Sequence, residues 1–252
     1  MASTRLAGKV AVITGAGAGI GRTYAQRLAA EGATVVVADI GPTAETVKLI
    51  ENEGGRAVGS HADVADPDSV AALVRAATEL DGHVDILVNN AAIYPVQPFE
   101  DITFEQWRRM MSINLDGVFL TCQGFLPGMK EQRWGRIVNI ASSVLLYTNV
   151  NYTHYTASKA GVVGLTRALA SEVGDHGVTV NALAPGLTKT ATTGETHGRA
   201  FEYFAGLQAI GRPGLPEDLA GPLAFLVSDD AAWVTGEVLN ANGGMVKIGY
   251  AG

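Results

Sequence analysis

Short apolar runs alternate with helix-length segments along the whole chain. The runs are rich in β-branched residues and almost continuous, which is typical of strands covered on both faces of a parallel sheet. They are VAVIT (10–14), TVVVAD (34–39), DILVNN (85–90), RIVNIAS (136–142) and VTVNALAP (178–185), with GRAVGSHAD (55–63) and EVLNANG (237–243) as weaker candidates at the margins. The alternation predicts an α/β fold, a doubly wound parallel sheet of the Rossmann type with helices on both faces.

The segments between these runs predict helices over 20–32, 67–80, 104–130 and 154–174. No Pro- or Ser-rich linker and no internal repeat divides the chain, so we expect one domain over residues 1–252. One stretch, GLTKTATTGETHGRA (186–200), is polar and poor in core residues. It follows a strand end, where open α/β sheets bind ligands, so we expect a substrate lid at about 187–205 and keep a plain surface loop as the alternative.

Composition limits the partners of the chain. It has 252 residues, 47% of them hydrophobic, and a net charge of −7, which argues against nucleic acid or an anionic membrane as the main partner. The single cysteine, Cys122, lies in an apolar run and is expected to be a buried structural thiol. No apolar run reaches membrane-spanning length, and we expect a soluble, cytoplasmic protein. His61, His83, His176 and His197 show no metal-ligand spacing, so no metal is expected.

A glycine-rich turn follows the first strand in TGAGAGIG (14–21). The spacing G-x-x-x-G-x-G fits through Gly15, Gly19 and Gly21, whereas G-x-G-x-x-G would need glycine at Ile20. Glycines allow the backbone to approach a pyrophosphate, and the N-terminus of the next helix then faces its charge. Asp39 ends the second strand, where a carboxylate can accept hydrogen bonds from ribose hydroxyls and repel a 2′-phosphate. We therefore expect NAD rather than NADP.

The segment YTHYTASKAG (152–161) contains the candidate acid–base group. Tyr155 has a lysine four residues later, Lys159, and residues four apart share a helix face. We expect the ammonium to lower the tyrosine pKa from about 10 toward working pH. Ser142 ends a strand and can hydrogen-bond a carbonyl or alkoxide oxygen, whereas Ser143 is expected to point to the opposite face. Tyr152 and His154 have two alternative roles: they line the substrate pocket, or they only begin the helix.

Together these motifs resemble the short-chain dehydrogenase/reductase family, in order and across the whole chain. The resemblance rests on TGAGAGIG, NNAA (89–92), INLDG around Asn114, Ser142, YTASK (155–159) and PG (185–186). It implies a catalytic set of Asn114, Ser142, Tyr155 and Lys159, with Asn114 at a helix irregularity where a water relays protons to the lysine. The cofactor residues that the resemblance and the glycine loop together imply are Gly15, Gly19, Ile20, Gly21, Asp39, Asp63, Val64, Asn90, Ala91, Tyr155, Lys159, Pro185, Gly186, Thr188 and Thr190.

Two positions depart from the family pattern. NNAG is NNAA here, which places a methyl group at Ala92, and VDGG near the C-terminus is ANGG, with Asn242 in place of an acid. Neither position belongs to the catalytic set.

The expected function is hydride transfer between NAD(H) and a secondary alcohol or ketone. A 3-ketoacyl-(acyl carrier protein) reductase, a sugar or polyol dehydrogenase and a catalytically idle NAD-binding regulator remain as alternatives. The resemblance also implies a homotetramer, with a dimer as the alternative.

The substrate is expected to be apolar, an aryl-alkyl or cyclic alcohol. IYPV (93–96) and VLLY (144–147) follow strand ends and contain no lysine or arginine, although Lys189 and Arg199 lie in the expected lid, so no fixed counter-charge for a strongly anionic substrate is expected. AAIYPVQPFEDITFEQW (91–107), NYTHYTASKA (151–160) and APGLTKTATT (184–193) resemble aryl-alkyl secondary alcohol dehydrogenases of the 1-phenylethanol type. The predicted pocket residues are Ile93, Tyr94, Val144, Leu145, Tyr152 and Phe204. A polar substrate, with these side chains in the core, is the alternative.

Overall fold

The computed structural model describes residues 4–147, 149–198 and 200–245. In this part of the chain, seven parallel strands form one sheet in the order β3-β2-β1-β4-β5-β6-β7. The predicted doubly wound sheet is confirmed, and each predicted strand is present within two residues of its expected ends. The strands are β1 (Val10–Thr14), β2 (Thr34–Asp39), β3 (Arg56–His61), β4 (Ile86–Asn89), β5 (Gly135–Ile140), β6 (Val178–Pro185) and β7 (Val238–Ala241).

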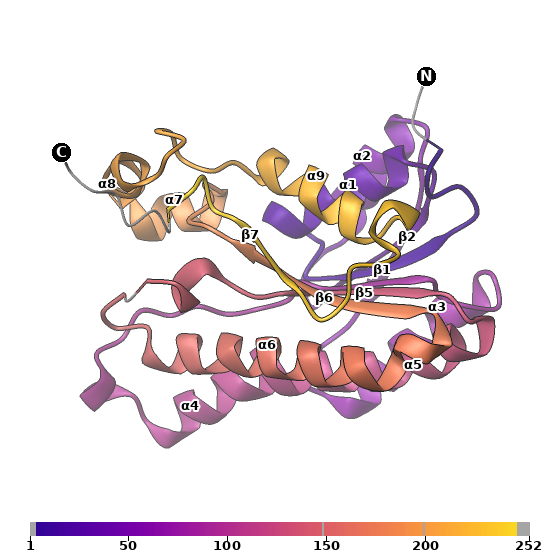
Figure 1. Cartoon of the computed structure of the whole chain (residues 1–252), viewed down its shortest axis with the longest axis horizontal. Helices are drawn as coiled ribbons and strands as arrows, with labels where there is room; N and C mark the ends of the chain where they lie inside the picture. Colours follow the sequence, from indigo (N-terminus) through magenta and orange to yellow (C-terminus); the bar gives the residue numbers. More distant parts are fainter. Residues whose placement is uncertain (1–3, 148, 199, 246–252) are drawn as a thin grey trace.

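Helices cover both faces of the sheet (Figure 1). One layer contains α1 (Gly19–Ala30), α2 (Ala44–Asn52) and α9 (Pro216–Leu226), with α1 packed between the other two. The other layer contains α3 (Pro67–Glu79), α4 (Phe104–Met111), α5 (Gly117–Gln132) and α6 (Thr153–Val173). The sequence expectations did not include α2 and α9.

The core consists of two main clusters, one on each side of the sheet. Alternate residues of β1 belong to different clusters: Ile13 packs with Leu28 of α1 and Leu223 of α9, and Val12 packs with Phe125 of α5. All five β1 residues are buried. Successive strand side chains point to opposite faces, so a strand covered on both sides is continuously apolar.

The predicted lid differs from an irregular loop. It contains two short helices, α7 (Ala191–His197) and α8 (Ala200–Leu207), which lie beyond the end of β6 in Figure 1. Thr190 begins α7 with reciprocal hydrogen bonds: its hydroxyl accepts from the Thr193 N–H at 3.1 Å, and its own N–H donates to Thr193 Oγ1 at 2.7 Å. Such a capping box starts a helix even in a polar sequence. Arg199 lies outside the described residues.

The predicted helix over 104–130 is interrupted. Between α4 and α5 lies one turn of π-helix, Ser112–Asp116, with Asn114 fully buried at its centre. A π-bulge of this kind is frequently found at a functional site. In the described part of the chain, no helix combines the length and the apolar character needed to cross a membrane.

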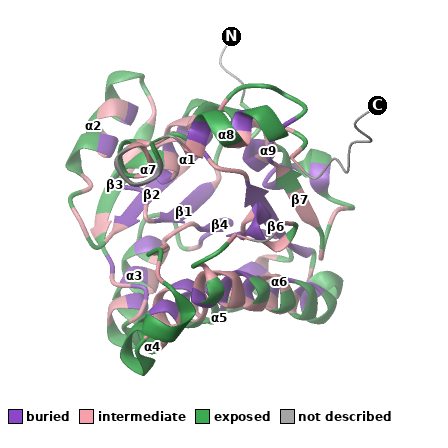
Figure 2. Cartoon of the chain, turned by 90° about the vertical axis from the view of Figure 1, so that its left-hand side faces the viewer, coloured by how far each residue is buried: buried purple, intermediate pink, exposed green. Residues whose placement is uncertain are grey.

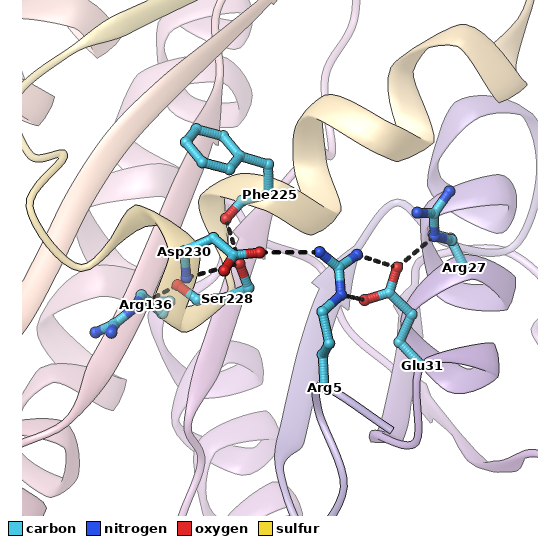
Figure 3. A network of polar contacts seen from close by, with 7 residues as sticks. All are labelled: Arg5, Arg27, Glu31, Arg136, Phe225, Ser228 and Asp230. Atoms are coloured by element: carbon cyan, nitrogen blue, oxygen red, sulfur yellow. Dashed lines mark hydrogen bonds and ion pairs between the residues drawn. The ribbon is translucent and has the colours of Figure 1, made fainter. Parts of the chain in front are cut away.

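An ion cluster at the opposite end of the sheet from the lid joins distant parts of the chain (Figure 3). Glu31, whose side chain is 3% exposed, accepts two hydrogen bonds from Arg5 at 2.8 and 3.0 Å and one from Arg27 at 2.6 Å. Arg5 also donates to Asp230, near the end of the described chain, at 3.2 Å. Burial by itself favours the neutral carboxyl, but the hydrogen bonds from the two arginines outweigh it and lower the pKa of Glu31.

We expect Glu31→Gln to lower the free energy of unfolding at pH 7 by about 1.5–3 kcal/mol, because it weakens charge-assisted hydrogen bonds at a buried site. A lowered carboxyl pKa stabilises the fold above the ordinary value of 4.5 and loses that effect as the pH falls through the folded value. The difference from wild type should therefore shrink in acid, as chemical denaturation at several pH values would measure. Glu45→Gln, at an exposed partner of Arg22, is the control. Equal losses in both variants would contradict the prediction.

Candidate active site

A cavity of about 940 Å³ opens at the carboxyl ends of the strands. Segments that follow each of the strands β1 to β6 line it, together with α7 and α8. Figure 2 views the chain from this side, with α7 and α8 above the sheet and α4, α5 and α6 below it. The volume of the cavity lies at the upper end of the usual range for ligand pockets.

The glycine loop leaves no room for a side chain at Gly15 or Gly21. A Cβ added at Gly21 would collide with the carbonyl oxygen of Gly15 and come within 2.6 Å of Asn90 Nδ2. Gly15 itself has a φ of +64°, in the left-handed region. Asn90 Nδ2 donates to the carbonyls of Thr14 and Gly15 at 2.9 and 3.0 Å, so this side chain ties the end of β4 to the loop after β1.

Asp39 is held in place by the backbone. Its carboxylate accepts from the N–H groups of Gly17 and Gly41 at 2.9 and 2.8 Å. Gly17 was not required by the sequence spacing, yet a Cβ there would approach the Pro42 carbonyl oxygen to 2.7 Å and Asp39 Oδ2 to 3.0 Å. Gly17 is therefore needed for steric reasons that depend on the following strand and loop.

The loop leads into the first turn of α1, whose N-cap Ala18 provides no side-chain cap. The free N–H groups and positive end of the helix dipole suit the pyrophosphate of a dinucleotide, and Asp39 suits a ribose diol. The residues present thus fit a nicotinamide dinucleotide. All of the predicted cofactor residues line the cavity, namely Gly15, Gly19, Ile20, Gly21, Asp39, Asp63, Val64, Asn90, Ala91, Tyr155, Lys159, Pro185, Gly186, Thr188 and Thr190.

Tyr155 and Ser142 meet at the floor of the cavity, where their side chains are hydrogen-bonded. Ser142 follows β5, and its Oγ also accepts from the Val144 N–H at 3.2 Å. Ser143 is turned away as expected: it is fully buried, and its hydroxyl donates to the Ala184 carbonyl at 3.1 Å. Two hydroxyl groups can therefore face one substrate oxygen.

The pKa of Tyr155 is raised rather than lowered. Burial raises the pKa of Tyr155 to about 12, and the Ser142 hydrogen bond offsets only part of this increase. Lys159 Nζ lies 5.8 Å from the centre of the Tyr155 ring and donates to the Ile140 carbonyl at 2.6 Å. The lysine is itself 3% exposed, and burial lowers its pKa to about 8. The prediction of a lowered tyrosine pKa is thus wrong here, because burial opposes ionisation of the phenol and the Ser142 hydrogen bond offsets only part of that effect.

Asn114 lies behind this floor rather than in the cavity wall. Its side chain accepts from the Ile93 N–H and donates to the Ile93 carbonyl, both at 2.9 Å. The amide also donates to Ser158 Oγ at 3.2 Å. Asn114 thereby joins the segment after β4 to α6, and its role in a proton relay stays a prediction.

The remaining cavity wall is mostly apolar and aromatic. Five of the predicted pocket residues line it: Ile93, Tyr94, Val144, Tyr152 and Phe204. Leu145, expected with them, does not line the cavity, because a turn of 3-10 helix follows Ser142 and changes the side-chain directions expected for a strand. His154 does not line it either; it is fully buried, and burial lowers its pKa.

Tyr147 and Arg109 are among the wall residues outside the predicted set. Tyr147 packs on Phe204 of the lid with ring centres 5.9 Å apart. Arg109 of α4 is exposed and lines the same cavity. The cavity therefore has a cation, although the predicted pocket segments contain none. The lid also reaches the wall through a hydrogen bond between Thr192 and Tyr94. No sequence pattern used above points to α4 as a wall of the pocket.

Comparison with known proteins finds relatives that match nearly the whole chain. A family model described as enoyl-(acyl carrier protein) reductase matches residues 15–246. A 3-oxoacyl-(acyl-carrier-protein) reductase from Thermotoga maritima is 39% identical over 96% of this chain and 99% of its own length. A hydroxy(phenyl)methyl-succinyl-CoA dehydrogenase subunit from Thauera aromatica is 40% identical over 94% of this chain and 96% of its own.

A solved structure agrees in fold over nearly the whole chain. It is described as a candidate NAD(P)-dependent gluconate 5-dehydrogenase from Beutenbergia cavernae with NADP bound at low occupancy. Its sequence is 42% identical, its TM-score is 0.90, and the match covers 96% of this chain and 98% of that one.

We expect Lys159→Met to stabilise the cofactor-free protein at pH 7 by about 1–3 kcal/mol, because it removes a buried charge. A lowered lysine pKa means that the unfolded chain binds a proton that the folded chain does not between about pH 8 and 10.5, so wild-type stability rises with pH there. The advantage of the variant is greatest below pH 8 and fades across that window. Thermal or urea unfolding at pH 7, 9 and 10.5 would measure it, with the exposed Lys48→Met as control. A variant less stable than wild type at every pH would show that the bond to Ile140 outweighs the charge burial.

Proposed function

Since the chain belongs to the short-chain dehydrogenase/reductase family and is an oxidoreductase, we propose that it is an NAD-dependent dehydrogenase of secondary alcohols that also reduces the corresponding ketones. The observation that carries the proposal is the meeting of Tyr155 and Ser142 in the floor of a cavity whose other end is a glycine loop with a fixed carboxylate. One end suits proton transfer and the other suits a dinucleotide.

Tyr155 is the proposed acid–base group, with Ser142 beside it. In ketone reduction the protonated phenol donates to the developing alkoxide oxygen while the serine hydroxyl holds that oxygen. In alcohol oxidation the phenolate takes the hydroxyl proton instead. The nicotinamide cofactor, when bound, supplies the hydride donor or acceptor. Because the pKa of Tyr155 is raised to about 12, oxidation should be favoured by alkaline pH and reduction by neutral pH.

Asp39 supports the choice of NAD. Both oxygens of its carboxylate are fixed by backbone N–H groups, so it is not free to rotate away from a 2′-phosphate. Arg22, at the start of α1, already donates to Glu45 and to the Gly17 carbonyl, both at 2.7 Å. A 2′-phosphate would meet a fixed negative charge and an arginine that is already engaged.

The cavity wall supports an aryl-alkyl or cyclic alcohol. Ile93, Val144, Tyr147 and Phe204 offer apolar and ring surfaces beside Tyr155, and flat aromatic groups pack well against such rings. The name of the Thauera aromatica relative describes a dehydrogenase whose substrate has a hydroxyl on a phenyl-bearing carbon. Arg109 at the same cavity is compatible with an acidic group on the substrate.

Two other substrates follow from the relatives. A 3-ketoacyl thioester is favoured by the Thermotoga maritima relative, and a sugar acid or polyol by the Beutenbergia cavernae structure. The fixed carboxylate of Asp39 disfavours reduction of a ketoacyl thioester with NADPH. The apolar cavity wall disfavours a sugar acid or polyol as substrate. Activity with NADPH and a ketoacyl thioester, but not with NAD⁺ and an alcohol, would establish the first alternative.

We expect Tyr155→Phe to keep NAD binding and to lose turnover by a factor of at least about 10², since it removes the acid–base hydroxyl but keeps the ring. Steady-state rates and a fluorescence titration of NADH would measure the two effects. Tyr152→Phe, at a neighbouring ring 5.8 Å away, is the control and should retain most of its activity. Near-normal turnover in Tyr155→Phe would remove this residue from the mechanism.

We expect the double variant Asp39→Ala, Ile40→Arg to shift preference from NAD toward NADP by at least about tenfold in kcat/KM. The change replaces a repulsive carboxylate with a phosphate partner, and Ile40 is exposed at the same cavity. Asp66→Ala, in the loop before α3, is the matched control. The assignment of Asp39 fails if wild-type protein already binds NADPH more tightly than NADH.

We expect an aryl-alkyl or cyclic secondary alcohol to give a larger kcat/KM with NAD⁺ than a sugar alcohol of similar size. The aryl-alkyl or cyclic alcohol packs against the apolar wall, whereas the hydroxyl groups of a sugar alcohol would find no hydrogen-bond partners there. The comparison requires a panel measured at one saturating NAD⁺ concentration. A reversed ranking would discard the apolar substrate while leaving the dehydrogenase proposal in place.

A further inference from the structure

Four polar side chains are buried together beneath the active-site floor. Asn89 of β4, Thr121 of α5, Asn139 of β5 and Thr166 of α6 are each at most 4% exposed. They lie among apolar residues on the α5–α6 side of the sheet, next to the cluster that includes Phe125. Buried amides and hydroxyls destabilise a fold unless they are hydrogen-bonded, so their arrangement needs a reason.

The four side chains form one hydrogen-bonded chain with a single direction. Thr121 Oγ1 donates to Asn89 Oδ1 at 2.7 Å, and Asn89 Nδ2 donates to Asn139 Oδ1 at 2.9 Å. Asn139 Nδ2 donates to Thr166 Oγ1 at 2.9 Å, and that hydroxyl donates to the Val162 carbonyl at 2.8 Å. The chain crosses from α5 through two strands to α6, and in it every hydroxyl and amide oxygen has a partner.

The hydrogen bond between Asn139 and Thr166 joins the same strand and helix as the contact between Lys159 and the Ile140 carbonyl. Asn139 is followed in β5 by Ile140, whose carbonyl accepts from Lys159 Nζ at 2.6 Å. Thr166 lies seven residues after Lys159 in α6, which is two helical turns and the same face of the helix. The pairs Asn139–Thr166 and Ile140–Lys159 therefore join consecutive residues of β5 to one face of α6, at positions two turns apart.

We propose that Asn139 and Thr166 are positioning residues for the reaction: their hydrogen bond fixes the register of α6 on β5 and so places Lys159 on the Ile140 carbonyl. Apolar packing alone permits small sliding of a helix on a sheet, whereas a directional bond between buried amide and hydroxyl groups selects one position. The proposal rests on the proposed function, because placing Lys159 matters for the reaction only if this lysine belongs to the catalytic set that the family resemblance implies.

The test compares Thr166→Val with Thr166→Ser. Valine keeps the shape but removes the hydroxyl, which leaves the Asn139 amide without its acceptor, and serine restores the hydroxyl. We expect kcat to fall about tenfold or more in Thr166→Val with a smaller change in KM, and to stay within about threefold of wild type in Thr166→Ser. Thr78→Val is the control, since Thr78 makes the same type of bond to a carbonyl one turn earlier, in α3 at 2.8 Å.

A second readout does not depend on activity. The reactivity of Lys159 toward acetic anhydride, followed against pH by mass spectrometry of its peptide, reports the pKa of that amine in wild type and variants. Wild type should have its midpoint near 8, and Thr166→Val should shift it upward, because a lysine displaced from the Ile140 carbonyl is more hydrated. If Thr166→Val does not fold, the same measurements apply to Thr166→Ala, which leaves space for water beside Asn139.

The outcomes separate the two proposals. A Thr166→Val protein that is less stable but has the wild-type pH profile and the wild-type Lys159 reactivity would overturn the positioning role. Loss of rate without rescue in Thr166→Ser would overturn it as well. A wild-type protein that oxidises no alcohol with NAD⁺ would overturn the proposed function, and the labelling experiment would still decide whether the buried chain places Lys159.

Discussion

The reversal of strand order between β1 and β4 governs the rest of the site. The chain builds β1, β2 and β3 outward in one direction and β4 to β7 in the other, so the loops after β1 and β4 separate at the carboxyl edge. A crevice at that point is a consequence of the topology. Asn90 bonds both the end of β1 and the glycine loop, and so holds the two loops at a fixed separation. The position of the cofactor cradle thus depends on one amide side chain at the switch point.

The proposed catalytic groups, Tyr155 and Lys159, are held in an environment that opposes their charged forms. Burial raises the pKa of Tyr155 and lowers that of Lys159, so both groups are shifted toward neutrality. A lysine against a backbone carbonyl and a phenol against a serine can change protonation with small changes in their surroundings. Burial of these two groups lowers the free energy of unfolding, as is common in active sites. The apolar clusters on both sides of the sheet offset that cost.

Much of the fold and the cofactor end could be predicted because the signals are local. Continuous apolar runs mark the strands, and the glycine spacing with an acid at the next strand end marks the loop. The substrate end was less accessible. Leu145 follows a serine where strand alternation gives way to a 3-10 turn, and Arg109 reaches the cavity from a helix whose place is set by a π-turn at Asn114. Gly17 is required by contacts with Pro42 and Asp39, which only the folded loop brings close.

By itself, the sequence determined the sheet and the glycine loop and indicated Asp39, Ser142, Tyr155 and Lys159 as candidate site residues, because periodicity and short spacing act through neighbouring residues along the chain. Only the tertiary structure decided the pKa of Tyr155, the acceptor of Lys159, the aromatic contact between Tyr147 and Phe204, and the buried chain from Thr121 to Thr166. These depend on burial and on contacts between segments far apart in sequence, where packing between a helix and a sheet sets distances that no local pattern contains.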